Sequence, residues 1–190
     1  MPKSFNPSLT SIRLAIIEDA CTISAIHVKT WQQTYHDSIP IEILSKISIK
    51  ERAKKWAELI ANNTRIFVIE YADKIIGFGS VCSSRDPDAD PIYCGEVSSL
   101  YIDPNFWGGG LGKKLLIYLI NQLEILGFTE VTLWVLKDNI NAQKFYEAMG
   151  FREDEKERTE VFDVAIEKEK TIKYAEIKMN EIRYYKKIKA

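Results

Sequence analysis

The sequence predicts one α/β domain with a mixed, mainly antiparallel sheet flanked by helices. Three observations lead to this prediction. Short apolar runs of strand length alternate with longer amphipathic stretches of helix length. Two of the apolar runs are separated only by "ADK", which indicates a β-hairpin. A glycine-rich segment joins a later strand to a leucine-rich helix.

The elements are expected in the order β-α-α-β-β-β-α-β-α-β-β. Leucines in the longest apolar helix recur at spacings of three and four, and Gly127 ends that helix. Residues 1–10 are polar and contain proline, so we expect a loose tail before one domain at 11–190. The expected elements are a strand at 11–17, a helix at 19–35 that Asp19 caps, a helical region at 41–61, a hairpin at 64–83, a strand at 93–102, a helix at 111–126, a strand at 130–136, a helix at 139–150 and, after a weakly alternating segment from 151, a final strand at 181–188.

The composition is that of an ordinary globular protein, with 46% hydrophobic residues and a net charge of −1. So small a charge favours neither nucleic acid nor an anionic membrane as a partner, and the apolar runs are too short to cross a bilayer. The polar N-terminus does not resemble a signal peptide, and the three scattered cysteines fit reduced thiols in the cytoplasm. With two histidines and no clustered cysteines, we expect no metal.

The segment "FWGGGLGKKLL" places a glycine cluster at the start of a helix. A Walker A loop would need a glycine at Trp107 and Ser or Thr at Lys114, and a Rossmann fingerprint would need its third glycine at Lys113. Both fingerprints therefore fail. Exposed amides at a helix N-terminus would still suit a pyrophosphate. From these residues alone, a flexible loop with two solvated lysines is an equally good interpretation.

Two longer segments, "GEVSSLYIDPNFWGGGLGKKLL" and "LWVLKDNINAQKFYEAMGF", together resemble the GNAT superfamily of acetyl-CoA-dependent N-acetyltransferases. The first resembles that family's strand, pyrophosphate loop and helix. The second resembles its N-x-x-A-x-x-F-Y-x-x-x-G-F signature, carried here by Asn139, Ala142, Phe145, Tyr146, Gly150 and Phe151. The resemblance covers about residues 75–151. It implies a GNAT-like fold and the transfer of an acetyl group from acetyl-CoA to a primary amine.

The resemblance also implies where acetyl-CoA binds. Strand backbone would pair with the pantetheine arm, and the amides of the glycine turn would hold the pyrophosphate. One departure is Trp107, which stands where the family usually has Gln or Arg and which we interpret as a packing aromatic. The implied cofactor-binding residues are Leu100, Tyr101, Ile102, Trp107, Gly108, Gly109, Gly110, Leu111, Gly112, Lys113, Asn139, Ala142 and Tyr146.

Two residues are candidates for the chemistry. Tyr146 would protonate the departing CoA thiolate, and it lies seven residues after Asn139, on the same helical face. Glu96 would be the general base, because a primary amine is almost wholly protonated at neutral pH. Outside this family context, Tyr146 would be an ordinary half-buried tyrosine and Glu96 a strand-edge carboxylate. No cysteine lies in these motifs, so we expect direct transfer in a ternary complex.

The acceptor is less well defined by the sequence. By resemblance it would bind near Trp31, Tyr35 and Tyr184, with His36 nearby, although Trp31 could be core and His36 a loop residue. Three aspartates, at 86, 88 and 90, could attract a cationic amine or belong to a solvated loop. The acceptor could be a small molecule or a peptide, and edge strands near the C-terminus make a homodimer plausible. A non-catalytic acetyl-CoA-binding or sensing domain is the alternative function.

Overall fold

The computed structural model describes residues 5–168 and 171–188. Its elements follow the predicted order, with one helical region divided into two and three short 3₁₀ turns added. The strands are β1 (Thr10–Leu14), β2 (Arg65–Tyr71), β3 (Lys74–Ser83), β4 (Cys94–Ile102), β5 (Glu130–Leu136), β6 (Arg152–Lys168) and β7 (Thr171–Lys187). The helices are α1 (Ala20–Thr34), α2 (Ile41–Leu44), α3 (Ile49–Ala61), α4 (Leu111–Ile125) and α5 (Ile140–Ala148).

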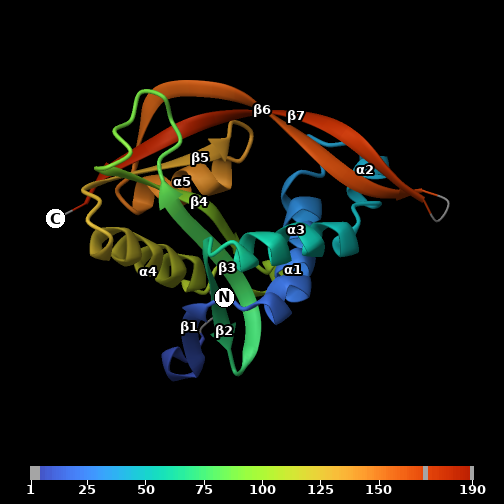
Figure 1. The fold of residues 1–190 in the computed structure, drawn as a ribbon, viewed down its shortest axis with the longest axis horizontal. Helices are drawn as coiled ribbons and strands as arrows, with labels where there is room; N and C mark the ends of the chain where they lie inside the picture. The colour runs from blue at the N-terminus through green and yellow to red at the C-terminus, as the bar shows by residue number, and fades with distance from the viewer. Residues whose placement is uncertain (1–4, 169–170, 189–190) are drawn as a thin grey trace.

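One sheet of seven strands, in the order β1-β2-β3-β4-β5-β7-β6, forms the centre of the molecule (Figure 1). Every neighbouring pair is antiparallel except β4 and β5, which the crossover through α4 makes parallel. The predicted mixed, mainly antiparallel sheet is therefore confirmed. The "ADK" turn is also confirmed, since Ala72 and Asp73 have positive φ and join β2 to β3.

Helices cover both faces of this sheet, and the alternation of side chains along β2 shows how. Phe67 and Ile69 join the core cluster that contains the buried leucines of α4. Ile66 and Val68 point to the other face and pack with Ile23 of α1. The sheet thus has an α4–α5 face and an α1–α3 face, and these names are used below.

The parallel pair β4–β5 is short, and this opens the sheet. Pairing covers three positions and ends where Glu96 lies opposite Thr132. β4 continues to Ile102 and β5 to Leu136, so their carboxyl-terminal halves diverge. A bulge in β4 adds to the divergence, because the register with β3 skips Ser98. The divergence produces a cleft that reaches from one face of the sheet to the other.

The last two strands form a long hairpin of 17 residues each, which extends past the sheet to the N-terminal helices (Figure 1). The segment between α2 and α3 pairs with β6: Ser48 donates its N–H to the Ala165 carbonyl, and Glu167 donates to the Lys46 carbonyl, both at 2.8 Å. This pairing explains why the predicted helix at 41–61 is two helices. Backbone groups at residues 46–48 bond to the hairpin instead of continuing a helix.

Three further expectations need correction. Residues 5–10 are not loose, since Phe5 packs on Tyr71 and Phe106 with ring centroids 5.2 and 5.5 Å apart; residues 1–4 lie outside the described residues. Asp19 does not cap α1 through its side chain, which instead accepts hydrogen bonds from Arg13 and from the backbone of residue 16. The expected first strand ends at residue 14 instead of 17, and a 3₁₀ turn begins at residue 17.

Candidate active site

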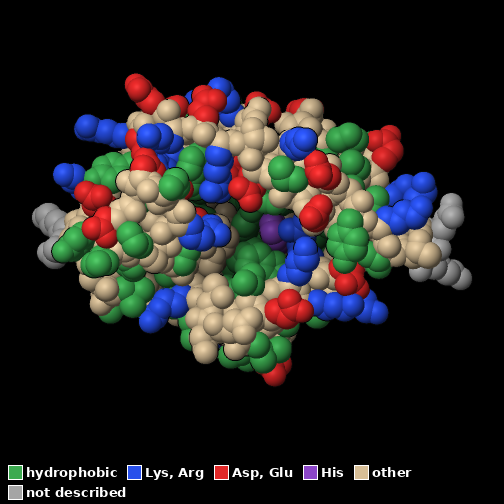
Figure 2. Space-filling model, turned by 45° about the horizontal axis from the view of Figure 1, so that its top comes forward, with side chains coloured by type: hydrophobic (Ala, Val, Ile, Leu, Met, Phe, Trp, Pro, Cys, Tyr) green, Lys and Arg blue, Asp and Glu red, His purple; other side chains and the backbone are tan. Residues whose placement is uncertain are grey.

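The cleft between β4 and β5 has a volume of about 1180 Å³. Its walls come from the end of α1, both diverging strands, the glycine turn, α5 and the inner side of the β6–β7 hairpin. Figure 2 shows the molecule hollowed near the centre of one face, with hydrophobic side chains inside and charged side chains around the hollow. So large a space accommodates a cofactor and a second substrate together.

The glycine turn forms one wall of the cleft and begins α4. Gly108 and Gly110 both have φ of +79°, and Gly110 is the N-cap. Gly110 is left-handed, and no side chain of the described residues caps the start of the helix. The first backbone amides of α4 therefore face outward. Gly112 and Lys113 also line the cleft, whereas Gly109 is not among its described lining residues. The turn has the geometry of an anion site.

Trp107 makes a polar contact in addition to packing. Its indole Nε1 donates a 2.7 Å hydrogen bond to the Ile102 carbonyl, while the residue stays 41% exposed and lines the cleft. The interpretation of Trp107 as a packing aromatic was therefore incomplete. The side chain fixes the glycine turn to the end of β4.

The cleft-facing edge of β4 presents backbone groups. Asp103 donates its N–H to the Ile76 carbonyl of the adjacent strand β3 at 2.8 Å. Because N–H groups alternate sides along an antiparallel strand, Tyr101 also pairs towards β3, and the N–H groups of Leu100 and Ile102 point into the opening. This edge is suited to pair with an extended ligand arm or to polarise a carbonyl.

Helix α5 forms the opposite wall. The Asn139 side chain caps it by accepting from the Ala142 amide at 3.1 Å, and Gly150, at φ +82°, follows its end. Asn139, Ala142 and Tyr146 all line the cleft, as the heptad spacing predicts. Tyr146 is 8% exposed, and burial raises the pKa of its hydroxyl well above the usual value. The hydroxyl therefore remains protonated at neutral pH and can donate a proton.

Glu96 lines the cleft but is fully engaged by a neighbour. Its side chain is 2% exposed and forms an ion pair with Arg85. Arg85 donates from Nη2 to Oε1 at 2.5 Å and from Nε to Oε2 at 3.2 Å. The backbone N–H of Arg85 donates to Oε2 as well, at 3.4 Å. Both carboxylate oxygens thus have hydrogen-bond partners.

The residues expected at the acceptor do not all reach the cleft. Tyr35 and His36 line it, and burial raises the pKa of Tyr35. Trp31 is 3% exposed and packs in the core beneath. Tyr184 is 1% exposed on the α4–α5 face, where its hydroxyl donates to Glu147 of α5 at 3.1 Å. Strand alternation is the reason, because Tyr184 lies an odd number of residues from the β7 positions that face the cleft.

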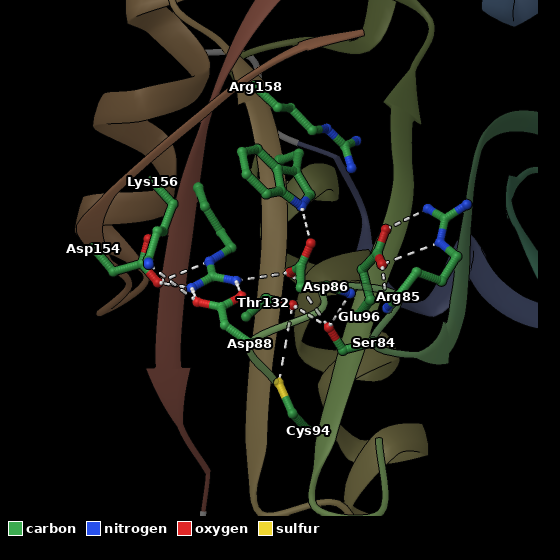
Figure 3. A network of polar contacts seen from close by, with 12 residues as sticks. Ser84, Arg85, Asp86, Asp88, Cys94, Glu96, Thr132, Asp154, Lys156 and Arg158 are labelled. Carbon is green, nitrogen blue, oxygen red and sulfur yellow. Dashed lines mark hydrogen bonds and ion pairs between the residues drawn. The ribbon is translucent and has the colours of Figure 1, made fainter. Parts of the chain in front are cut away.

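Two of the three aspartates in the loop between β3 and β4, Asp86 and Asp88, are ion-paired, so they do not attract a ligand as an unpaired acidic group would (Figure 3). Asp90 accepts a 2.9 Å hydrogen bond from the backbone N–H of Ile92 within the loop. Arg183 of β7 is 7% exposed at its side chain and contacts Asp86 at 3.1 Å and Asp88 at 2.7 and 2.9 Å. It also contacts Asp154 at 2.8 Å. Arg183 holds the pKa of Asp88 well below its usual range. This arginine anchors the loop that carries Arg85.

A group of cleft residues was missed by sequence reasoning: Trp134, Arg158, Glu160 and Glu181. They come from β5, β6 and β7 and face the α1–α3 side of the sheet. The Arg158 guanidinium lies over the Trp134 ring, 4.3 Å from its centroid, and donates from Nε to Glu181 at 2.8 Å. An available signal was the pair of charged residues at 181 and 183, two apart and therefore on the same face of the strand.

Among the described residues, no group of three or more His, Cys, Asp or Glu side chains is arranged to hold a metal ion. Within the same residues, every helix is too short or too polar to span a bilayer.

Comparisons with known proteins agree with this geometry. The model of the acetyltransferase (GNAT) family matches residues 25–151. An uncharacterized N-acetyltransferase of Bacillus subtilis is 30% identical over 69% of this chain and 74% of its own length. A ribosomal protein bS18-alanine N-acetyltransferase of Haemophilus ducreyi is 37% identical over 43% of this chain and 51% of its own.

A solved structure has the same fold. The PaiA N-acetyltransferase of Thermoplasma acidophilum, in complex with coenzyme A, superposes with a TM-score of 0.68 at 20% identity, over 94% of this chain and 99% of that one. This similarity extends to the β6–β7 hairpin, which the family match does not cover. The chain belongs to the acetyltransferase (GNAT) family.

Proposed function

We propose that this protein transfers the acetyl group of acetyl-CoA directly to a primary amine in a ternary complex. One observation carries the proposal: the outward-facing glycine turn, the open edge of β4 and a buried tyrosine hydroxyl meet in a single cleft that passes through the sheet. A thioester donor could bind on the α4–α5 face. An amine could then approach it from the α1–α3 face.

The donor would lie along β4. The N–H groups of Leu100 and Ile102 point into the opening and suit the amide groups of pantetheine or the acetyl carbonyl. The first amides of α4, beyond Gly110, suit the pyrophosphate, and Lys113 adds a positive charge beside them. Asn139 and Ala142 would line the opposite side of the same channel.

Tyr146 would act as the acid. Thioester cleavage produces a thiolate, and a hydroxyl with a raised pKa remains protonated until that charge develops. Direct transfer is supported by the low reactivity of the two cysteine thiols nearest the cleft. Burial raises the pKa of both the Cys82 and the Cys94 thiols, which makes either a weak nucleophile at neutral pH.

The acceptor would be a small molecule or a peptide that presents an amine. The named relatives support this class, since one acts on the alanine of a ribosomal protein and others are mycothiol acetyltransferases. The cleft wall on the acceptor side carries Glu96, Glu160 and Glu181 against Arg85 and Arg158. This balance slightly favours a cationic acceptor. A cytoplasmic location and a homodimer stay predictions from the sequence.

A panel of amines tests the proposal. The purified chain is incubated with acetyl-CoA and, separately, propylamine, spermidine, free lysine and a hexapeptide with a free N-terminal alanine. Thiol release and the mass of the products are measured. We expect acetylation of at least one amine. If acetyl-CoA raises the melting temperature but no amine is acetylated, the alternative function of a non-catalytic acetyl-CoA sensor is favoured.

A further inference from the structure

The β7 strand places a second carboxylate in the cleft, on the face from which the acceptor would approach. Glu181 lies opposite Leu136 of β5 on one side and opposite Arg158 of β6 on the other. Leu136 is the last residue of β5, where that strand has diverged from β4. Glu181 is therefore at the opening, and it lines the same cleft as Tyr146.

The two oxygens of the Glu181 carboxylate differ. Oε2 accepts a 2.8 Å hydrogen bond from Nε of Arg158, which is itself held over the Trp134 ring. Oε1 has no partner among the described residues. Asp154 Oδ1 is the one fully buried side-chain oxygen or nitrogen without a partner in the described part of the chain. Glu181 Oε1 also lacks a partner but is not fully buried, so it is accessible from the cleft that Glu181 lines.

We propose that Glu181, rather than Glu96, is the general base that deprotonates the acceptor amine; this inference rests on the proposed acetyl transfer. A base needs an open lone pair within reach of the substrate proton, directly or through one water. Glu181 has an open oxygen and a fixed orientation. Both Glu96 oxygens already accept hydrogen bonds from Arg85 and the side chain is only 2% exposed, so Glu96 offers the acceptor no partner-free oxygen.

The electrostatic surroundings support the same assignment. Burial raises the pKa of Glu181, and the charges of Glu160 and Glu96 raise it further, while Arg158 opposes them. Tyr35 and Tyr101 lie near enough for Glu181 to raise their pKa values in turn. A carboxylate whose pKa moves towards neutrality is a better base at physiological pH.

The proposed step conserves atoms and charge. The ammonium group of the acceptor gives one proton to Glu181 Oε1, which passes it to solvent. The neutral nitrogen attacks the thioester carbonyl, so that a C–N bond forms and the C–S bond breaks. Tyr146 gives its hydroxyl proton to the sulfur. The nitrogen then loses its second proton, which restores the Tyr146 hydroxyl.

The test is kcat/KM as a function of pH, with whichever amine of the panel the wild type acetylates fastest. Glu181→Gln is expected to lose about 10²-fold or more at pH 7 and to approach wild type as the pH nears the pKa of the amine. Because the charge of Glu96 raises the pKa of Glu181, Glu96→Gln is expected to move the acidic limb of the profile towards lower pH, without the loss at pH 7 that recovers at high pH. The control Glu157→Gln removes an exposed charge on the same hairpin, outside the cleft, and should change nothing. Glu181→Asp should recover part of the rate.

Two results would overturn the inference. One is a Glu181→Gln profile that is parallel to wild type and within about threefold of it, a loss too small for a positioned base. The other is a pH-dependent defect in Glu96→Gln alone. If Glu181→Gln does not fold, the Glu181→Asp variant decides, since a shortened carboxylate that costs nothing would exclude the role. Failure of the proposed function is distinguishable, because the wild type itself would then acetylate no amine.

Discussion

Replacing Arg183 by methionine removes the charge that anchors the loop between β3 and β4 while keeping most of the aliphatic stem. In the wild type, Arg183 contacts three carboxylates, those of Asp86, Asp88 and Asp154, at distances of 2.7 to 3.1 Å. The substitution leaves all three without this partner. The Trp134 indole still donates to Asp86 at 3.0 Å, but an indole N–H does not balance a charge.

The size of the effect follows from the burial of each carboxylate. The Asp86 side chain is 5% exposed, so removing its partner leaves a buried charge, which costs about 3–5 kcal/mol. Asp88 is 42% exposed, so water compensates for most of what it loses, and Asp154, at 26%, is compensated only in part. In a chain of this length, about 3–5 kcal/mol corresponds to a fall in melting temperature of about 6–20 °C.

Urea unfolding measures the loss of stability, with Arg152→Met as a control at an exposed arginine of the neighbouring strand. The pH dependence is a second readout. Because Arg183 lowers the pKa of Asp88, this pair stabilises the fold above the ordinary aspartate pKa of about 4, and the stabilisation is lost as the pH falls below it. The Arg183→Met variant should lack that part of the acid sensitivity. A loss below about 1 kcal/mol, or one equal to the control, would refute the burial argument.

Two other predictions concern the donor side of the cleft. Gly110→Val places a β-branched residue at φ +79°, where the strain of about 1–3 kcal/mol should reshape the turn and weaken acetyl-CoA binding about tenfold or more in calorimetry. An unchanged Kd would mean that the pyrophosphate does not bind at this turn. Tyr146→Phe should lower kcat by about 10²- to 10⁴-fold and leave the Kd for acetyl-CoA unchanged. A normal kcat, with chemistry rate-limiting, would remove the acid role.

Local sequence signals predicted α4, the turns beside it and the start of α5 well. Leu111, Leu115, Leu119 and Leu123 of α4 are at most 4% exposed, as their spacing predicts, and Gly127 has the left-handed φ of a helix end. Leu126 is the exception at 40% exposed, because the helix has ended before it. The glycine turn and the cap at Asn139 depend on residues close in sequence, so they could be read from short motifs.

The side of the cleft formed by β5, β6 and β7 depends on contacts distant in sequence, and there the sequence was insufficient. Tyr184 was expected in the cleft, but Glu181 of the same strand lines it instead, because the register of β7 and the side each residue faces depend on its pairing with β5 and β6. The pairing of Arg183 with a loop some 95 residues earlier in the chain left no local pattern. The ion pair between Arg85 and Glu96 also left no local pattern, because it forms only once the loop between β3 and β4 is closed.

Strand β7 carries both Arg183 and Glu181, and substitutions of these two residues should change the stability in opposite directions. Arg183 stabilises the fold, so its loss should be visible in stability. Glu181 has a raised pKa, which means that ionising it in the native state costs free energy. Its stabilising contribution is present below the ordinary glutamate pKa of about 4.3 and is lost as the pH rises through its native value. The melting temperature of Glu181→Gln should thus improve relative to wild type between pH 4 and pH 8, while activity at pH 7 falls. If the difference in melting temperature between the two proteins does not change with pH, Glu181 is not desolvated in solution, and the physical reason for its basicity is lost.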